Sequence, residues 1–389
     1  MLTLSTTRHL AGFVFTKNMA MPRPKLAELS PVAHGTLDYA ELARLGLQPD
    51  KLIDFSANSN PYGPHPTVLA ALADALQADR LARYPDRDCL ALRAALAAVD
   101  ETPPETILPG NGATELIHLI ALALVEPGSR QVVIGPTFGQ YAHVIRLAGA
   151  EVIEYRPPTS APSLCLEAES VAAALRRWQP AGIWLCNPNN PTGQQWSAAE
   201  LAHLRAATPD ALWVVDESYR YFTAIPTPLT GWTGDENLIL LRSLTKDQAL
   251  AGLRLGYVIA AQAVITALRA AQPTWSVNTL AQVAGVAALQ PEVLAWRDDT
   301  LTSLHRHAAE LWAGLTEWGY SVLPTATPYA LVQVADAAAW RERLLFQGVQ
   351  VRDCASFGLP QYARIAARRP EENKRLLSAV KNLVETKQF

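Results

Sequence analysis

Residues 242–257 decide the fold, and they read RSLTKDQALAGLRLGY. A continuous apolar run, LILL, leads into them and is typical of a buried strand. Two hydroxyl side chains, Ser243 and Thr245, flank a leucine just before Lys246, and Arg254 follows eight positions later. Burial lowers the pKa of a lysine and favours the neutral amine that attacks carbonyls, while hydroxyls and an arginine suit a phosphate. The stretch therefore indicates an imine-forming lysine beside a phosphate site; the alternative is a surface lysine in a polar loop.

Two other segments extend this chemistry. Asp216 closes the apolar run LWVV, so we expect its carboxylate at the ligand edge of a sheet, although a helix N-cap or a loop would also suit it. Residues 110–114 (GNGAT) precede a helical pattern, and free backbone N–H groups at a helix start bind phosphate. A carboxylate that keeps a pyridine nitrogen protonated, a lysine and a phosphate clamp are together what pyridoxal 5'-phosphate (PLP) requires. A dinucleotide site is disfavoured because Glu115 replaces the third glycine of GxGxxG.

Apolar runs and helical patterns alternate through the middle of the chain. The runs are continuously apolar instead of apolar at every second residue, as in strands that are covered on both faces. Their alternation with helices predicts an α/β fold with an open, mostly parallel central sheet flanked by helices, and ligands bind beyond the carboxyl ends of such strands. The predicted strands cover residues 107–108, 132–134, 152–155, 183–186, 212–215 and 238–241.

The pattern changes after residue 273, where long helices at 279–289 and 292–318 precede several short strands. We interpret this part as a second, smaller α+β domain. The predicted division is a disordered or linker lead at 1–30, an N-terminal segment joining the small domain at 31–66, a large PLP-binding α/β domain at 67–285, and a small C-terminal α+β domain at 286–389.

Composition excludes several classes of protein. The chain has 389 residues, of which 49% are hydrophobic and 18% charged, so it can bury a large core. A net charge of -3 argues against nucleic acid as a partner, and no apolar run is long enough to span a membrane. Four cysteines without CxxC spacing indicate reduced thiols in a cytoplasmic protein. No metal site is predicted, since His305 and His307 face different ways on a helix.

Three motifs carry a resemblance to a known family. They are NPNNPTG at residues 187–193, DESY at 216–219, and SLTK with AGLRLGY within 243–257. Together they resemble the class I and II aminotransferases, which are PLP enzymes of fold type I. The resemblance runs from residue 31 to the C-terminus. It implies the PLP-dependent transferase fold, PLP as the cofactor, and a homodimer with shared active sites.

The resemblance also implies roles for individual residues. As catalytic residues it implies Lys246, which would form the imine and move protons, Asp216 and Tyr219. The cofactor-binding residues would be Ala113, Thr114, Phe138, Asn190, Asp216, Tyr219, Ser243, Thr245, Lys246 and Arg254, with Tyr62 reaching the phosphate from the neighbouring subunit. The substrate-binding residues would be His34, Asn58, Arg352 and Arg364. Of these, Arg364 would hold a carboxylate and Arg352 a phosphate; a surface ion pair is the alternative for Arg352.

Two branches of the family fit the motifs best. GNGATELI, TWSVN at 274–278 and VRDC at 351–354 favour a threonine-phosphate decarboxylase of cobalamin side-chain synthesis. Tyr62 and Tyr219 favour a histidinol-phosphate aminotransferase. We therefore expect a PLP enzyme that acts at the α-carbon of a small phosphorylated amino compound. Decarboxylation is the first hypothesis and transamination is the alternative.

Overall fold

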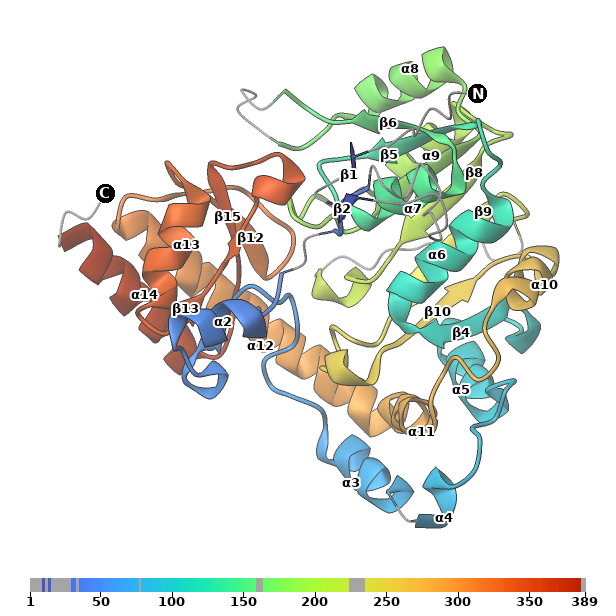
Figure 1. The fold of residues 1–389 in the computed structure, drawn as a ribbon, viewed down its shortest axis with the longest axis horizontal. Helices are drawn as coiled ribbons and strands as arrows, with labels where there is room; N and C mark the ends of the chain where they lie inside the picture. Colours follow the sequence, from blue (N-terminus) through green and yellow to red (C-terminus); the bar gives the residue numbers. More distant parts are fainter. Residues whose placement is uncertain are drawn as a thin grey trace, which may run out of the picture.

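The computed structural model describes residues 9–10, 13–14, 29–32, 35–76, 78–158, 164–223 and 235–385. Within these ranges the chain forms a seven-stranded sheet and a four-stranded sheet, each with its own helices, and two short two-stranded pairs. Figure 1 shows the large sheet with its green and yellow strands on the right and the small sheet in orange and red on the left. The predicted α/β class with a mostly parallel central sheet is confirmed.

The large sheet has seven strands in the order β4-β10-β9-β8-β7-β5-β6 among the described residues. Every run predicted as a strand lies in one of them, and four of the ladders are parallel. β10 was not predicted; it uses the end of the lysine stretch and pairs antiparallel with both β9 and β4. The strands are β4 (Ile107–Asn111), β5 (Arg130–Ile134), β6 (Glu151–Tyr155), β7 (Gly182–Cys186), β8 (Leu212–Asp216), β9 (Leu238–Ser243) and β10 (Leu255–Ile259).

The large sheet is buried on both faces, which explains the continuous apolar runs. Along β8, Trp213 and Val215 pack into one hydrophobic cluster, while Val214 between them packs into another. We call the two sides the α5 face, which holds Trp213 and Val215, and the α6 face, which holds Val214. The helices of this part of the chain are α3 (Pro66–Ala75), α4 (Ala78–Leu81), α5 (Leu90–Asp100), α6 (Gly112–Leu124), α7 (Gln140–Ala148), α8 (Ala168–Trp178), α9 (Ala198–Ala206), α10 (Gln262–Ala271) and α11 (Thr279–Ala288).

The small sheet is antiparallel, in the order β11-β12-β15-β14. Its strands are β11 (Ser321–Val322), β12 (Tyr329–Gln333), β14 (Arg352–Asp353) and β15 (Tyr362–Ala366), and its helices are α12 (Pro291–Glu317), α13 (Ala337–Leu345) and α14 (Pro370–Glu385). The N-terminal segment reaches this part: β3 (Ile53–Asp54) pairs in parallel with β13 (Val349–Gln350), and α2 (Tyr39–Leu45) lies beside them in Figure 1. The predicted domain boundaries stay predictions.

The N-terminal part departs from the sequence prediction in detail. The apolar residues around 51–57 favour a short strand, but only the two residues of β3 form one. Thr67 would suit a helix cap by its residue type; instead α3 begins at Pro66, and the ring of His65 accepts the N–H of Thr67. Near the chain start, β1 (His9–Leu10) pairs with β2 (Phe13–Val14). Every helix in the described ranges is too short or too polar to cross a bilayer.

Candidate active site

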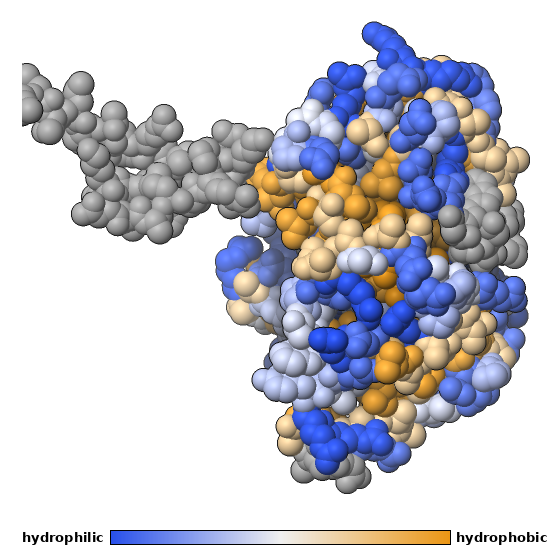
Figure 2. All heavy atoms as spheres, turned by 90° about the vertical axis from the view of Figure 1, so that its right-hand side faces the viewer, coloured by the Kyte–Doolittle hydropathy of each residue, from blue (hydrophilic) through white to orange (hydrophobic). Residues whose placement is uncertain are grey.

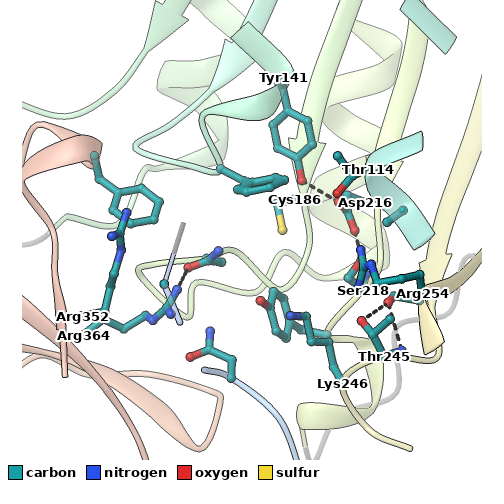
Figure 3. A pocket seen from close by; sticks show the side chains of 18 residues that line it. Thr114, Tyr141, Cys186, Asp216, Ser218, Thr245, Lys246, Arg254, Arg352 and Arg364 are labelled. Atoms are coloured by element: carbon teal, nitrogen blue, oxygen red, sulfur yellow. Dashed lines mark hydrogen bonds between the residues drawn. The ribbon is translucent and has the colours of Figure 1, made fainter. Parts of the chain in front are cut away.

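A cavity of about 210 Å³ lies at the carboxyl ends of β8 and β9. Asp216 and Ser243 end these strands, while Arg352 and Arg364 reach the cavity from β14 and β15 of the small sheet. Figure 3 shows the two small-sheet arginines on one side and Arg254 with Thr245 on the opposite side. The predicted site residues that line the cavity are Asn58, Ala113, Thr114, Phe138, Asn190, Asp216, Tyr219, Ser243, Thr245, Lys246, Arg254, Arg352 and Arg364.

Lys246 follows β9 and is fixed by its main chain, whose carbonyl accepts the N–H of Asn60 at 2.9 Å. Burial lowers the pKa of Lys246 to about 8, the positive charges of Arg364 and Arg254 act in the same direction, and Asp216 opposes them. A lysine of this kind carries a useful fraction of neutral amine near physiological pH, which is the form that attacks carbonyls. The structure thus disfavours the alternative of an ordinary surface lysine.

Asp216 ends β8 with a buried carboxylate that holds two hydrogen bonds. Its Oδ2 accepts the phenol of Tyr141 at 2.6 Å, and its Oδ1 accepts the backbone N–H of Ser218 at 2.8 Å. Burial raises the pKa of Asp216, and the hydrogen bonds from Ser218 and Tyr141 act against that rise. A cation in the cavity, such as a protonated ring nitrogen, would stabilise the ionised form further.

The end of the cavity near Arg254 collects donors suited to an anion. Ser243 Oγ and Thr245 Oγ1 lie 2.7 Å apart, and α6 begins beside them. Gly112, the first residue of α6, has a φ of +78°, and a Cβ there would stand 2.6 Å from Nη2 of Arg254. Glycine therefore lets the guanidinium lie directly against the helix start. Two hydroxyls, a guanidinium and a helix N-terminus are donors of the kind that can bind a phosphate.

Tyr219 and Asn190 stand on loops that follow β8 and β7. Burial raises the pKa of Tyr219 to about 12, so its phenol keeps its proton and can donate a hydrogen bond. Nη1 of Arg364 donates to Oδ1 of Asn190, and Nη2 donates to the backbone carbonyl of Ser56. These contacts hold the guanidinium of Arg364 at the cavity wall.

Arg352 and Arg364 form a buried pair of like charges. They are Cα partners in the ladder between β14 and β15, and they are 8% and 4% exposed. Gly35 lies against both, since a Cβ there would stand 3.0 Å from Arg352 Cδ and 3.0 Å from Arg364 Nη2. Burial, and next the charge of Arg364, lowers the pKa of Arg352. This end of the cavity thus presents two guanidiniums, and Asp216 is the one carboxylate among the described residues that line the cavity.

One predicted residue, Tyr62, is not brought into the cavity of this chain, and the structure does not test another, His34. Tyr62 lies outside it, with its phenol oxygen 3.1 Å from Nδ1 of His307 and its ring 5.5 Å from the guanidinium of Arg369. This position leaves the predicted contact with a neighbouring subunit untested. His34 lies outside the described residues, although the adjacent Gly35 lines the cavity.

The sequence prediction missed several lining residues, above all Tyr141, Ser218 and Phe357. A signal for Tyr141 was present, because it lies three residues after Phe138 at the start of a helix, where such residues share a face. The two rings meet edge to face with centroids 5.7 Å apart. Nothing in the sequence around Phe357 indicated a place in the site, since the loop after β14 is brought there only by the small sheet.

A family model described as "Aminotransferase class I and II" matches residues 50–380. The chain belongs to the class I and II aminotransferases. The resemblance inferred from the three motifs is therefore confirmed, and with it the assignment to a family of PLP-dependent enzymes. Most of the large and small sheets fall within the matched residues, as do all described residues of the cavity except Gly35.

Relatives of this chain are named for two different activities. A histidinol-phosphate aminotransferase of Symbiobacterium thermophilum is 35% identical over 366 residues, which cover 93% of this chain and 98% of the relative. The crystal structure of an L-threonine-O-3-phosphate decarboxylase from Porphyromonas gingivalis matches with a TM-score of 0.74 and 27% identity, covering 85% of this chain and 99% of that one. A histidinol-phosphate aminotransferase from Sinorhizobium meliloti, solved with pyridoxal-5'-phosphate, has a TM-score of 0.80 at 23% identity over 95% and 99% of the two chains and shares the fold.

The residues of the cavity fit PLP. A half-buried lysine with a lowered pKa, a buried carboxylate, and the hydroxyl and guanidinium groups around Gly112 match the aldehyde, ring nitrogen and phosphate of that cofactor. At Gly256 a Cβ would stand 2.8 Å from the backbone nitrogen of Ala113, so this glycine also keeps the start of α6 close to β10. In the described ranges, no three His, Cys, Asp or Glu side chains come together as a metal site.

Proposed function

We propose that this protein is a PLP-dependent aminotransferase that acts on a small phosphorylated amino compound, in the manner of a histidinol-phosphate aminotransferase. The pair Arg352 and Arg364 opposite Lys246 carries the proposal, because two buried guanidiniums at one end of the cavity suit an anionic group on the substrate. The identity of 35% to the Symbiobacterium relative supports transamination over the decarboxylation that the motifs placed first. It equally weakens the expected role in cobalamin side-chain synthesis.

The predicted residues that line the cavity have the following roles in this proposal. When bound, PLP supplies an aldehyde for the substrate amine and an electron sink for the charge that develops at the α-carbon. Lys246 holds the cofactor and moves the proton of the α-carbon, and Asp216 keeps the ring nitrogen protonated. Tyr219 and Asn190 hydrogen-bond the ring oxygen, and Phe138 covers the ring. The donors that hold the cofactor phosphate are the N–H groups of Ala113 and Thr114 with the side chains of Ser243, Thr245 and Arg254.

The substrate anions would lie at the small-sheet end of the cavity. Arg364 is held by Asn190 and the backbone of Ser56, so it presents a fixed guanidinium suited to a carboxylate or phosphate. Arg352 adds a second guanidinium, and Asn58 lines the cavity beside them. A phosphate carries up to two negative charges near neutral pH, so two arginines match it better than one. His34, next to Gly35, is part of the proposal as a further phosphate ligand.

A homodimer with shared active sites is also part of the proposal. Tyr62 is held beside His307, away from the cavity of its own chain, which would leave it able to serve a partner. Figure 2 shows hydrophobic side chains gathered over a broad area of one face of the molecule. Large exposed hydrophobic side chains such as Leu69 and Leu122 are of the kind that a subunit contact buries. A cytoplasmic location is also part of the proposal, because the spacing of the cysteines indicates reduced thiols.

The decisive experiment supplies the purified protein, loaded with PLP, with histidinol phosphate and an oxo acid. We expect the oxo acid to be converted into its amino acid without release of CO2. Reduction with borohydride followed by peptide mapping should find the cofactor on Lys246. Release of CO2 and aminopropanol phosphate from threonine phosphate, without any need for an oxo acid, would instead make the protein a decarboxylase of the same cofactor class.

A further inference from the structure

A buried ion network lies behind the cavity, and none of its members lines it. The network consists of Asp100, Glu217, Arg220 and Arg242, which we call the Asp100 network. Asp100 Oδ1 is 2.7 Å from Arg220 Nη2 and 2.8 Å from Arg242 Nη1, and Nε of Arg242 donates to Glu217 Oε2 at 2.8 Å. Two carboxylates therefore meet two guanidiniums with almost no exposure to water. Removing one partner from such a network leaves a charge uncompensated in a medium of low dielectric constant.

Three members of the Asp100 network are adjacent in sequence to residues that line the cavity. Glu217 follows Asp216, Arg220 follows Tyr219, and Arg242 precedes Ser243. Successive residues of a strand point to opposite faces, so along β9 Ser243 lies toward the α6 face while Arg242 lies toward the α5 face. The clusters agree: Tyr257, whose phenol donates to Asp100 at 2.6 Å, packs on the α5 face.

Asp100 joins parts of the chain that are distant in sequence. It is the last residue of α5, and its partners stand on β9, on β10 and on the short helix η3 (Arg220–Phe222). Although burial acts to raise the pKa of Asp100, Arg220 and Arg242 hold that pKa below its usual value. The carboxylate is therefore ionised at neutral pH and neutralises the arginines.

A second contact extends the network toward the lysine. Arg220 donates to the phenol of Tyr221, and the guanidinium of Arg297 on α12 lies 3.5 Å over the Tyr221 ring. Nη1 of Arg297 is 3.8 Å from Oδ2 of Asp247, the residue after Lys246. Buried charged side chains therefore lie on both sides of Lys246 in the sequence, at Arg242 before it and at Asp247 after it.

We propose that the Asp100 network sets the electrostatic potential at Lys246 from behind the sheet, and that Asp100 is a positioning residue of the active site. The proposal rests on the proposed function in one respect, namely that Lys246 holds the cofactor. Because the network is balanced, changing one charge changes the potential at the lysine with a sign that depends on which charge is lost. If the network only supported the fold, losing a negative charge and losing a positive charge would not change the potential at Lys246 in opposite directions.

Other charged and titratable groups face Lys246 from each neighbouring element. They are Asp216 at the end of β8, Tyr219 after it, Arg254 after η5 (Ala251–Leu253), and Arg364 on β15. All of them stay unchanged in the variants below. Their contribution is constant, so a difference between variants reports the network alone.

The experiment measures, in the PLP-loaded protein, the pH midpoint of the absorbance change that reports the proton on the Lys246 nitrogen. Asp100→Asn should lower the midpoint by about half a unit to one unit, because the remaining arginines disfavour a proton. Arg220→Met should raise it by a similar amount, and the double variant should return it toward the wild-type value. Tyr257→Phe removes a hydrogen bond to Asp100 without changing charge and should leave the midpoint in place.

Equal midpoints in all variants, or shifts of the same sign in Asp100→Asn and Arg220→Met, would overturn the proposal. Should Asp100→Asn fail to fold, Glu217→Gln removes a negative charge from the other end of the network and must shift the midpoint in the same direction. Thermal unfolding and bound PLP are measured for every variant. Failure of the proposed function looks different, because the wild-type protein itself would then lack PLP on Lys246.

Discussion

Arg352 and Arg364 stand directly opposite each other on neighbouring strands of the small sheet, both buried. Like charges in a directly opposed pair destabilise a sheet. No carboxylate among the described lining residues sits between them, and Gly35 packs against both side chains. A fold that keeps such an arrangement gains from it when an anion enters. The pair is therefore the structural reason to expect a substrate with a phosphate or carboxylate group.

Replacing Arg352 tests this reading. We expect Arg352→Met to lower kcat/KM for the phosphorylated substrate by about 10- to 100-fold, since a charge-assisted hydrogen bond contributes about 1.5–3 kcal/mol. The ligand-free protein should be as stable as the wild type or more so, because the repulsion is gone. Steady-state kinetics and thermal unfolding measure the two effects. Arg146→Met, which breaks an exposed pair with Glu154, is the control and should change neither by much.

Tyr141 should affect cofactor binding and catalysis through its hydrogen bond to Asp216. Tyr141→Phe removes the donor at 2.6 Å and keeps the ring, so the pKa of Asp216 should rise and its hold on the ring nitrogen should weaken. We expect PLP affinity and kcat each to fall by up to about 10-fold, within the ~1.5–3 kcal/mol of a hydrogen bond to a charged group. Equilibrium dialysis and kinetics provide the measurements.

The matched control for Tyr141 is Tyr320→Phe, which removes a hydrogen bond that Trp340 of α13 donates, away from the cavity. It should cost stability without changing PLP affinity. Equal PLP affinities for Tyr141→Phe and wild type would show that Ser218 alone suffices to hold Asp216.

Lys246 should destabilise the cofactor-free protein in a pH-dependent way. Its folded-state pKa of about 8 lies below its ordinary value of 10.5, so the folded state resists protonation. Below pH 8 both states carry the proton and the cost is complete, at about 2 kcal/mol after allowance for water in the cavity. Between pH 8 and 10.5 the unfolded state binds more protons, so stability rises with pH.

Lys246→Met removes this cost. The cofactor-free variant should be more stable than cofactor-free wild type at pH 7, and the difference should disappear as the pH approaches 10.5. Urea unfolding at a series of pH values measures it. A constant difference over the whole range would mean that packing, and not charge, distinguishes the two side chains. The variant should also be inactive at every pH.

Gly112 should be required for the phosphate site. Gly112→Ala places a Cβ 2.6 Å from Nη2 of Arg254 and forces a side chain into a φ of +78°. We expect PLP affinity to fall by more than about 10-fold, together with about 1 kcal/mol of stability from the backbone conformation. Gly46→Ala is the matched control: its φ is +70° and its Cβ would meet nothing within 4 Å. It should lose similar stability and keep its affinity for PLP, as measured by dialysis.

The sequence predicted most residues that line the candidate site, because several of them lie at the ends of strands. Asp216 and Lys246 follow apolar runs, and the carboxyl ends of parallel strands meet at one edge whatever the loops do. The proposed phosphate site could be predicted for a similar reason, since the N–H groups at the start of a helix have no partner within the helix. These signals are local in the chain and need no knowledge of what packs against them.

The sequence by itself determined the parallel strands of the large sheet, the cofactor class and the place of Lys246 just after β9, because apolar periodicity and strand-end chemistry depend on neighbouring residues. Only the tertiary structure decided that Tyr141 serves Asp216, that Arg352 faces Arg364, and that Asp100 neutralises two arginines behind the site. Each of these contacts joins separate elements of the fold. Such contacts depend on how the helices pack and how strands align, and packing selects them from many equally polar candidates along the chain.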